Sequence, residues 1–162
     1  MREFSNAAQV FEHHFPGCVQ MDPSRDGPNR RPLETEIERL SPNTSVTFGR
    51  PHYTQHPAGP PSLPGFGRQT WAATEKQTPL GATAGALRLV AAIHSAQSTY
   101  GVTIVPRVRI RIDPKSWHRS LLVEIREADV QAKGWFGRKR TLRQNEYLAR
   151  RVFTHLHHLL NE

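Results

Sequence analysis

The segment from Val102 to Ile112 is the feature that most constrains the fold, because apolar residues occupy every second position. The apolar set is Val102, Ile104, Pro106, Val108, Ile110 and Ile112, and the residues between them include Arg107, Arg109 and Arg111. Side chains alternate between the two faces of a β-strand, so this spacing predicts a half-buried strand. Its polar face would carry three arginines about 7 Å apart. Like charges at that spacing repel one another, and a polyanionic ligand would relieve the repulsion.

A second strand is predicted over 120–132, which gives a hairpin of about 102–112 and 120–132. Its apolar residues change face partway along, near Glu127. Leu121, Val123 and Ile125 point one way, whereas Ala128, Val130 and Ala132 point the other. Either a β-bulge or a strand that leaves the sheet explains this slip of the two-residue period.

Helices are predicted on both sides of the hairpin in sequence, over about 79–100 and 141–160. Thr78 and Pro79 provide an N-cap and a proline in the first turn, and Gly101 provides a C-terminal cap. The last helix is amphipathic. Its apolar stripe contains Leu148, Val152, Phe153, Leu156, Leu159 and Leu160, and its opposite side carries Arg143, Tyr147, Arg150, Arg151 and His158.

These elements predict an α+β fold in which the two helices cover a small sheet. A hairpin alone is only marginally stable. We therefore expect one or two further strands from the first half of the chain, or a homodimer that completes the sheet.

The chain is predicted to contain one basic domain over 45–162, preceded by a less regular arm over 1–44. The arm contains candidate short helices at 4–14, with Ser5 as N-cap, and at 33–40. A short strand is predicted over 45–48, and the segment 49–67 is interpreted as a loop rich in proline and glycine. The sequence has 13 prolines and 11 glycines, and most of them precede residue 82, which places the regular structure in the second half.

The composition narrows the classes of partner. Lysine and arginine number 22 against 14 acidic residues, a net charge of +8, which favours polyanions such as nucleic acid. The single cysteine excludes an internal disulfide and a zinc site built from several thiolates. No apolar run approaches the roughly 20 residues of a membrane span. We expect a cytoplasmic protein, or a nuclear one if Arg138–Arg140 acts in targeting, with neither cofactor nor metal.

Arginine side chains bind phosphates through paired hydrogen bonds, and aromatic side chains stack on bases. The sequence therefore predicts a nucleic-acid-binding protein that contacts phosphates largely without sequence specificity, with duplex RNA favoured over DNA. A viral or phage accessory protein would suit so small and basic a chain. The predicted contact residues are Arg107, Arg109, Arg111, Arg119, Arg138, Lys139, Arg140, Arg143, Arg150, Trp117 and Trp135.

Two alternatives stay open. Some metal-dependent nucleases place one acid at a strand end and an acid-x-lysine pair on the next strand. Asp113 and Glu124 would be the acids here, with Arg126 in place of the lysine, although an arginine cannot give up its proton. The second alternative is an adaptor or inhibitor that uses the same arginines to bind an acidic protein.

Overall fold

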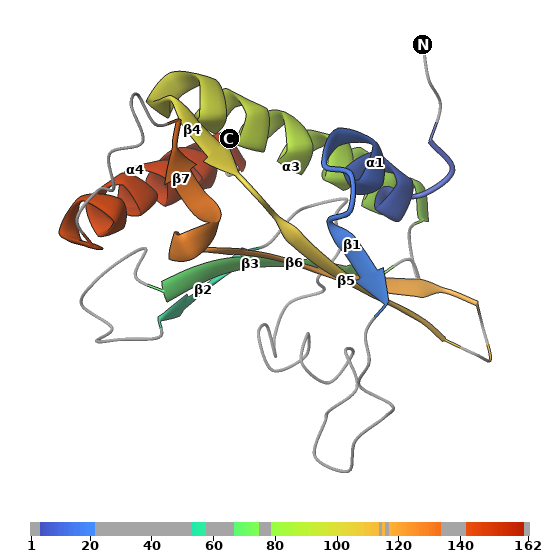
Figure 1. Cartoon of the computed structure of the whole chain (residues 1–162). Coiled ribbons are helices and arrows are strands. Elements are labelled where there is room, and N and C mark those ends of the chain that lie inside the picture. The colour runs from blue at the N-terminus through green and yellow to red at the C-terminus, as the bar shows by residue number, and fades with distance from the viewer. Residues whose placement is uncertain are drawn as a thin grey trace.

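The α+β fold is confirmed in a computed structural model (Figure 1), which describes residues 4–21, 53–57, 67–74, 79–113, 115, 117–133 and 142–160. Its elements, in chain order, are α1 (Ala7–His14), β1 (Val19–Met21), β2 (Tyr53–Pro57), β3 (Gly67–Thr74), α3 (Pro79–Tyr100), β4 (Val102–Ile104), β5 (Arg107–Ile112), β6 (Arg119–Arg126), the 3-10 helix η1 (Glu127–Asp129), β7 (Val130–Ala132) and α4 (Leu142–Leu160).

Among the residues that the structure describes, five strands form the main sheet, in the order β1-β5-β6-β3-β2. β1 runs parallel to β5, and the other neighbours are antiparallel. Three of these strands come from the first half of the chain, where one or two were expected. One chain therefore builds a sheet of ordinary size without strands from a second copy.

The predicted hairpin is divided between two sheets. β5 and β6 pair within the main sheet, whereas β4 and β7 form a separate two-stranded sheet. Between β6 and β7 the chain passes through η1, and the Val105 N–H donates to the Asp129 carbonyl at 3.0 Å across this junction. The slip of the apolar period near Glu127 thus marks a strand that leaves the sheet, which is one of the two predicted explanations.

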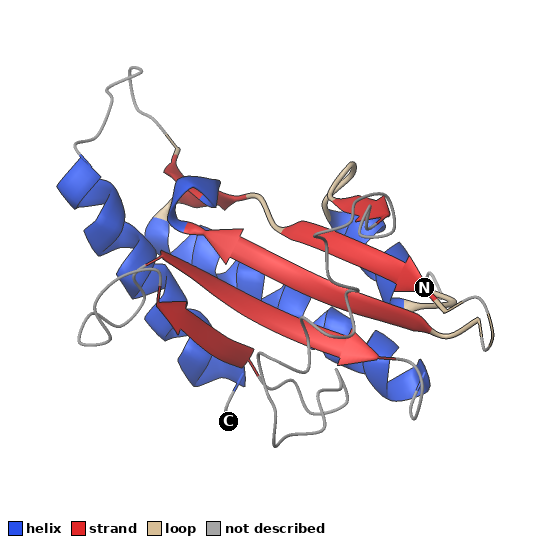
Figure 2. Ribbon diagram, turned by 90° about the horizontal axis from the view of Figure 1, so that it is seen from below, coloured by secondary structure: helices blue, strands red, loops and turns tan. Residues whose placement is uncertain are grey.

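All three helices described in the structure lie on one side of the main sheet (Figures 1 and 2). α3 spans Pro79–Tyr100, as the sequence predicts, and Gly101 follows it with a φ of 60° in the left-handed region. The apolar stripe of α4 is buried in the same core as α3, with Leu159 half-buried at its margin. Among the described residues, no helix is both long and apolar enough to cross a membrane.

The beginning of the chain belongs to this core, which corrects the prediction of a less regular arm for residues 4–21. Val10 and Phe11 of α1 are fully buried, and β1 extends the sheet. The helix is capped by Asn6, whose side chain accepts the Gln9 N–H at 3.0 Å, and not by Ser5. The predicted helix at 33–40 and strand at 45–48 lie outside the described residues.

β2 lies inside the segment 49–67, for which the sequence predicts a loop. Proline in this segment suggested irregular structure because proline lacks an N–H donor. Pro57 is the last residue of β2, however, and β2 is the edge strand beyond β3. An edge position tolerates proline because one side of the strand needs no partner. The strand was missed for that reason.

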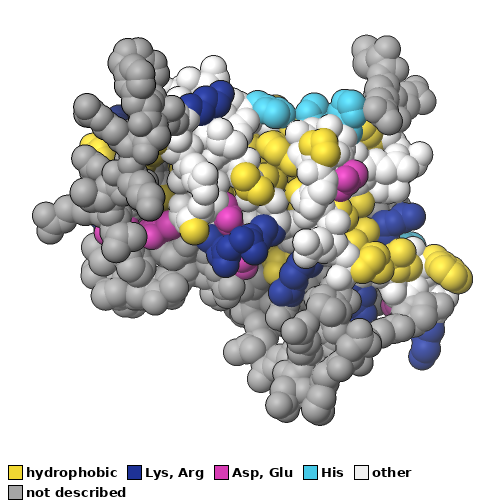
Figure 3. Space-filling view, viewed as in Figure 1, with side chains coloured by type: hydrophobic (Ala, Val, Ile, Leu, Met, Phe, Trp, Pro, Cys, Tyr) yellow, Lys and Arg dark blue, Asp and Glu magenta, His cyan; other side chains and the backbone are white. Residues whose placement is uncertain are grey.

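A histidine pair joins α1 to α3. His14 Nδ1 lies 3.3 Å from His94 Nε2, and the His94 ring stacks on Phe15 with centroids 5.2 Å apart. Figure 3 shows histidines gathered along the top of this helix layer. Burial lowers the pKa of His14, and the neighbouring His94 and His13 lower it further. The folded protein therefore favours the neutral form of His14.

This arrangement predicts that acidification weakens the fold. As the pH falls, His14 of the unfolded chain binds a proton near pH 6.5, whereas His14 of the folded chain binds one only at a lower pH. Neutral His14 therefore makes its full contribution to the free energy of unfolding above pH 6.5. This contribution decreases as the pH falls through the lower pKa of the folded state. The urea midpoint should fall more steeply between pH 7.5 and 5.5 for the wild type than for His14→Gln. Equal slopes for the two proteins would contradict the assignment, and His158→Gln on the exposed side of α4 serves as control.

Candidate nucleic-acid interface

The arginines of β5 lie on the side of the sheet turned away from the helices. Val108 and Ile110 are buried in the core, and the alternation along β5 places Arg107, Arg109 and Arg111 on the other face. Paired residues of neighbouring strands share a face. On β6, the residues paired with Arg107, Arg109 and Arg111 are Glu124, Leu122 and Ser120, respectively.

Arg126 follows Glu124 by two residues on β6 and therefore joins the same face. We call this surface the basic face and define it by Arg107, Arg109, Arg111 and Arg126. Arg107 and Arg126 have side chains 54% and 41% exposed, whereas Arg109 and Arg111 are half-buried. The row along β5 thus continues onto the neighbouring strand.

The register between β3 and β6 pairs Arg126 with a further arginine of the chain. Arg68 is paired with Arg126 across the two strands. The sequence pattern predicts a loop before Arg68 and does not predict β3, so it does not indicate Arg68. It indicates Arg126 only as a substitute for a catalytic lysine.

A buried carboxylate holds two of these arginines in place. Asp129 is only 6% exposed, and its two oxygens lie 3.4 Å from Arg107 Nε and 3.4 Å from Arg126 Nε. It also accepts the backbone N–H of Arg126 at 2.9 Å. Arg126 Nε lies 3.9 Å from a Glu124 oxygen as well. One acid in η1 therefore fixes the start of β5 and the end of β6 relative to each other.

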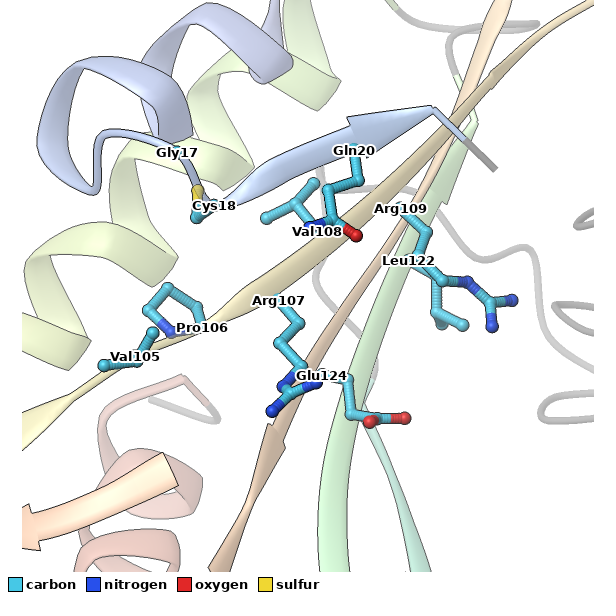
Figure 4. Close-up of a pocket in the computed structure, with 10 residues that line it drawn as sticks. All are labelled: Gly17, Cys18, Gln20, Val105, Pro106, Arg107, Val108, Arg109, Leu122 and Glu124. Carbon is cyan, nitrogen blue, oxygen red and sulfur yellow. The ribbon is translucent and has the colours of Figure 1, made fainter. Parts of the chain in front are cut away.

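A pocket of about 340 Å³ opens on the basic face where β1, β5 and β6 meet (Figure 4). Its polar side chains come from all three strands: Gln20 from β1, Arg107 and Arg109 from β5, and Glu124 from β6. The other lining residues are Gly17, Cys18, Val105, Pro106, Val108 and Leu122. The pocket therefore combines a mostly apolar wall with two cations, one carboxylate and one amide.

Cys18 contributes an inert thiol to this wall. Burial raises the pKa of Cys18 to about 12, and the nearby Glu12 carboxylate raises it as well. The Sγ–H group lies 3.5 Å from the Phe11 carbonyl, to which it donates. Because the reactive species of cysteine is the thiolate, this residue is not a nucleophile at neutral pH.

The β5–β6 hairpin presents Trp117 at its tip. The side chain is 74% exposed, and the backbone φ of 61° is unusual for a residue with a bulky side chain. Hydrogen bonds hold the turn: the Trp117 N–H donates to the Asp113 carbonyl at 2.8 Å, and the Lys115 N–H donates to the Asp113 carboxylate at 2.8 Å. The turn thus holds a large aromatic ring outward in a strained conformation.

Replacing Trp117 with glycine is expected to stabilise the protein. The left-handed conformation costs a non-glycine residue about 1–2 kcal/mol. Glycine avoids that cost but loses more backbone entropy on folding, about 0.5–1 kcal/mol. The net gain in unfolding free energy should be roughly 0.5–1 kcal/mol, measured by urea denaturation. Trp117→Ala, which keeps a Cβ atom, is the control, and a glycine variant less stable than the alanine variant would contradict the prediction.

The structure does not bring all the predicted contact residues together. Arg119 is in register with Ile112, so it belongs to the helix side of the sheet. Arg150 lies half-buried on α4, in the helix layer on the opposite side of the sheet from the basic face. Arg143 lies in the first turn of α4. Arg138, Lys139, Arg140 and Trp135 are outside the described residues. The strand and helix arginines placed by the structure therefore do not form one groove.

The two acids of the nuclease alternative are far apart. The Asp113 N–H donates to the His118 carbonyl at the hairpin end, and Glu124 lies six residues further along β6. At about 3.3 Å per residue this is a separation of roughly 20 Å. Carboxylates that share a metal ion each lie about 2 Å from it. Within the part of the chain that the structure describes, no three histidine, cysteine or acidic residues are placed to hold a metal.

Comparison with known proteins gives no relative for this chain. No family model matches it, and neither the curated proteins nor the solved structures contain a match.

Proposed function

We propose that this protein binds nucleic acid by contacting backbone phosphates through the basic face, largely without sequence specificity. The observation that supports the proposal best is the row of Arg107, Arg109 and Arg111 on one strand, which Arg126 extends onto the next strand. Residues two apart on a strand lie about 7 Å apart, a distance comparable with that between successive phosphates of one nucleic-acid strand. Guanidinium groups bind phosphate oxygens in pairs, which suits this arrangement.

Duplex RNA is the ligand that we expect. Five strands at about 4.8 Å spacing make a surface roughly 20 Å wide, which is too broad to enter the major groove of B-form DNA, about 12 Å wide. A-form RNA presents a wide, shallow minor groove with phosphates on both sides, and proteins recognise it mainly by its shape. The arginine row of β5, with Arg126 on β6, can contact the phosphates along one side of that groove.

Fluorescence anisotropy with labelled duplex RNA, duplex DNA and single strands tests the proposal over a salt series. Counterion release predicts that the logarithm of the affinity falls linearly with the logarithm of the salt concentration. We expect that behaviour, with duplex RNA bound most tightly. Absence of binding to all three ligands at low salt would overturn the proposal and favour an acidic protein as the partner of the same arginines.

A further inference from the structure

We propose that the pocket on the basic face receives one unpaired base of the bound nucleic acid, and that it favours guanine over uracil. This inference rests on the proposed function and adds the kind of ligand: a nucleic acid with an unpaired nucleotide beside paired backbone. It also adds base selectivity at that single nucleotide to contacts that are otherwise unselective.

The size and lining of the pocket fit a nucleotide. Its volume of about 340 Å³ lies at the lower end of the range for small-molecule sites, roughly 300–1,000 Å³. A nucleobase has apolar faces and polar edges. The faces match the wall formed by residues such as Val105, Pro106 and Leu122, and the edges match Gln20 and Glu124.

The position of the pocket couples base binding to phosphate binding. Arg107 and Arg109 line the pocket and also begin the arginine row of β5 (Figure 4). A nucleotide whose base enters the pocket therefore has its own phosphate and the next one within reach of this row. Asp129 orients the Arg107 side chain from behind, at 3.4 Å, so that one of these phosphate contacts is pre-positioned.

Glu124 supplies the selectivity. Its carboxylate accepts hydrogen bonds but donates none. Guanine presents two adjacent donors, N1–H and N2–H, on its pairing edge, whereas uracil presents one donor between two carbonyl oxygens that the carboxylate repels. The chemistry of this carboxylate thus favours guanine over uracil.

The test uses three labelled RNA hairpins with the same stem: fully paired, with one bulged guanosine, and with one bulged uridine. Anisotropy at fixed salt should show the guanosine bulge bound about tenfold more tightly than the paired stem, and more tightly than the uridine bulge. Glu124→Gln should bind all three hairpins but lose most of the preference for guanosine. Glu146→Gln on α4 removes the same charge away from the basic face and should keep the preference.

The outcomes separate this inference from the proposed function. Salt-dependent binding of all three hairpins with equal affinity would overturn the base pocket and leave phosphate binding standing. Equal binding of the two bulges would overturn the selectivity assigned to Glu124. Absence of binding to every hairpin would overturn the proposed function itself. The comparison among wild-type affinities decides these cases even if the Glu124 variant does not fold.

Discussion

Replacing Arg107, Arg109 and Arg111 together with glutamine is expected to weaken nucleic-acid binding by on the order of 100-fold near 0.15 M salt. Each arginine that contacts a phosphate releases about one counterion, so the slope of log affinity against log salt should also become shallower by about one per lost contact. Glutamine keeps much of the side-chain length and polarity of arginine. Because Arg107→Gln also removes one cation from the buried Asp129, urea denaturation must show that the triple variant is folded.

A control variant with the same net charge separates the contribution of the basic face from that of the overall net charge of the protein. Arg88, Lys133 and Arg151 are all exposed, and none of them belongs to the basic face. Their simultaneous replacement with glutamine should reduce affinity far less, through long-range attraction alone, and leave the salt slope nearly unchanged. Equal losses in the two triple variants would show that binding depends on net charge and not on the arginine row.

Replacing Asp129 with alanine is expected to reduce the unfolding free energy by about 2–3 kcal/mol. The variant leaves the Arg126 N–H without its 2.9 Å acceptor and removes the counter-charge of two arginines. Loss of one partner of a fully buried ion pair costs about 3–5 kcal/mol. The value here should be lower because both arginine side chains are about half exposed and water solvates them. Urea denaturation measures the difference.

Asparagine at the same position separates the hydrogen bond from the charge. Asp129→Asn keeps one oxygen that can accept the Arg126 N–H, so it should lose only about 1–2 kcal/mol. Glu124→Gln changes a carboxylate that lies 3.9 Å from Arg126 and should lose less than about 1 kcal/mol. If Asp129→Ala were as stable as the wild type, the carboxylate would not be the link between β5 and β6 that its contacts indicate.

The elements predicted best are those whose signals are local. Pro79 and Gly101 mark the ends of α3 because one fits the first turn of a helix and the other adopts the left-handed conformation after it. The apolar period of α4 fixes its buried side in the same way. Alternation along β5 placed its three arginines on one face, and the structure gives them that common face.

The parts that sequence could not supply depend on pairing between distant segments. β1 has three residues, and nothing in its sequence indicates that Val19 pairs with Val108. Arg68 is paired with Arg126 only through the register of β3 with β6. Asp129 reaches Arg107 because the β5–β6 hairpin brings the end of β6 back beside the start of β5, and η1 follows β6 directly; this is a tertiary relationship. The pocket needs all three strands, so no local pattern could reveal it.

The parallel pairing of β1 with β5 has a consequence for local opening. β1 is a short edge strand whose partner lies far away in sequence, and such elements open at a lower free energy than the core of a sheet. Gly17, Cys18 and Gln20 form one wall of the pocket and move with this strand. The amide hydrogens of β1 should therefore exchange with solvent sooner than those of β6. A ligand seated against that wall would slow their exchange, so occupancy of the pocket and attachment of residues 4–21 are thermodynamically linked.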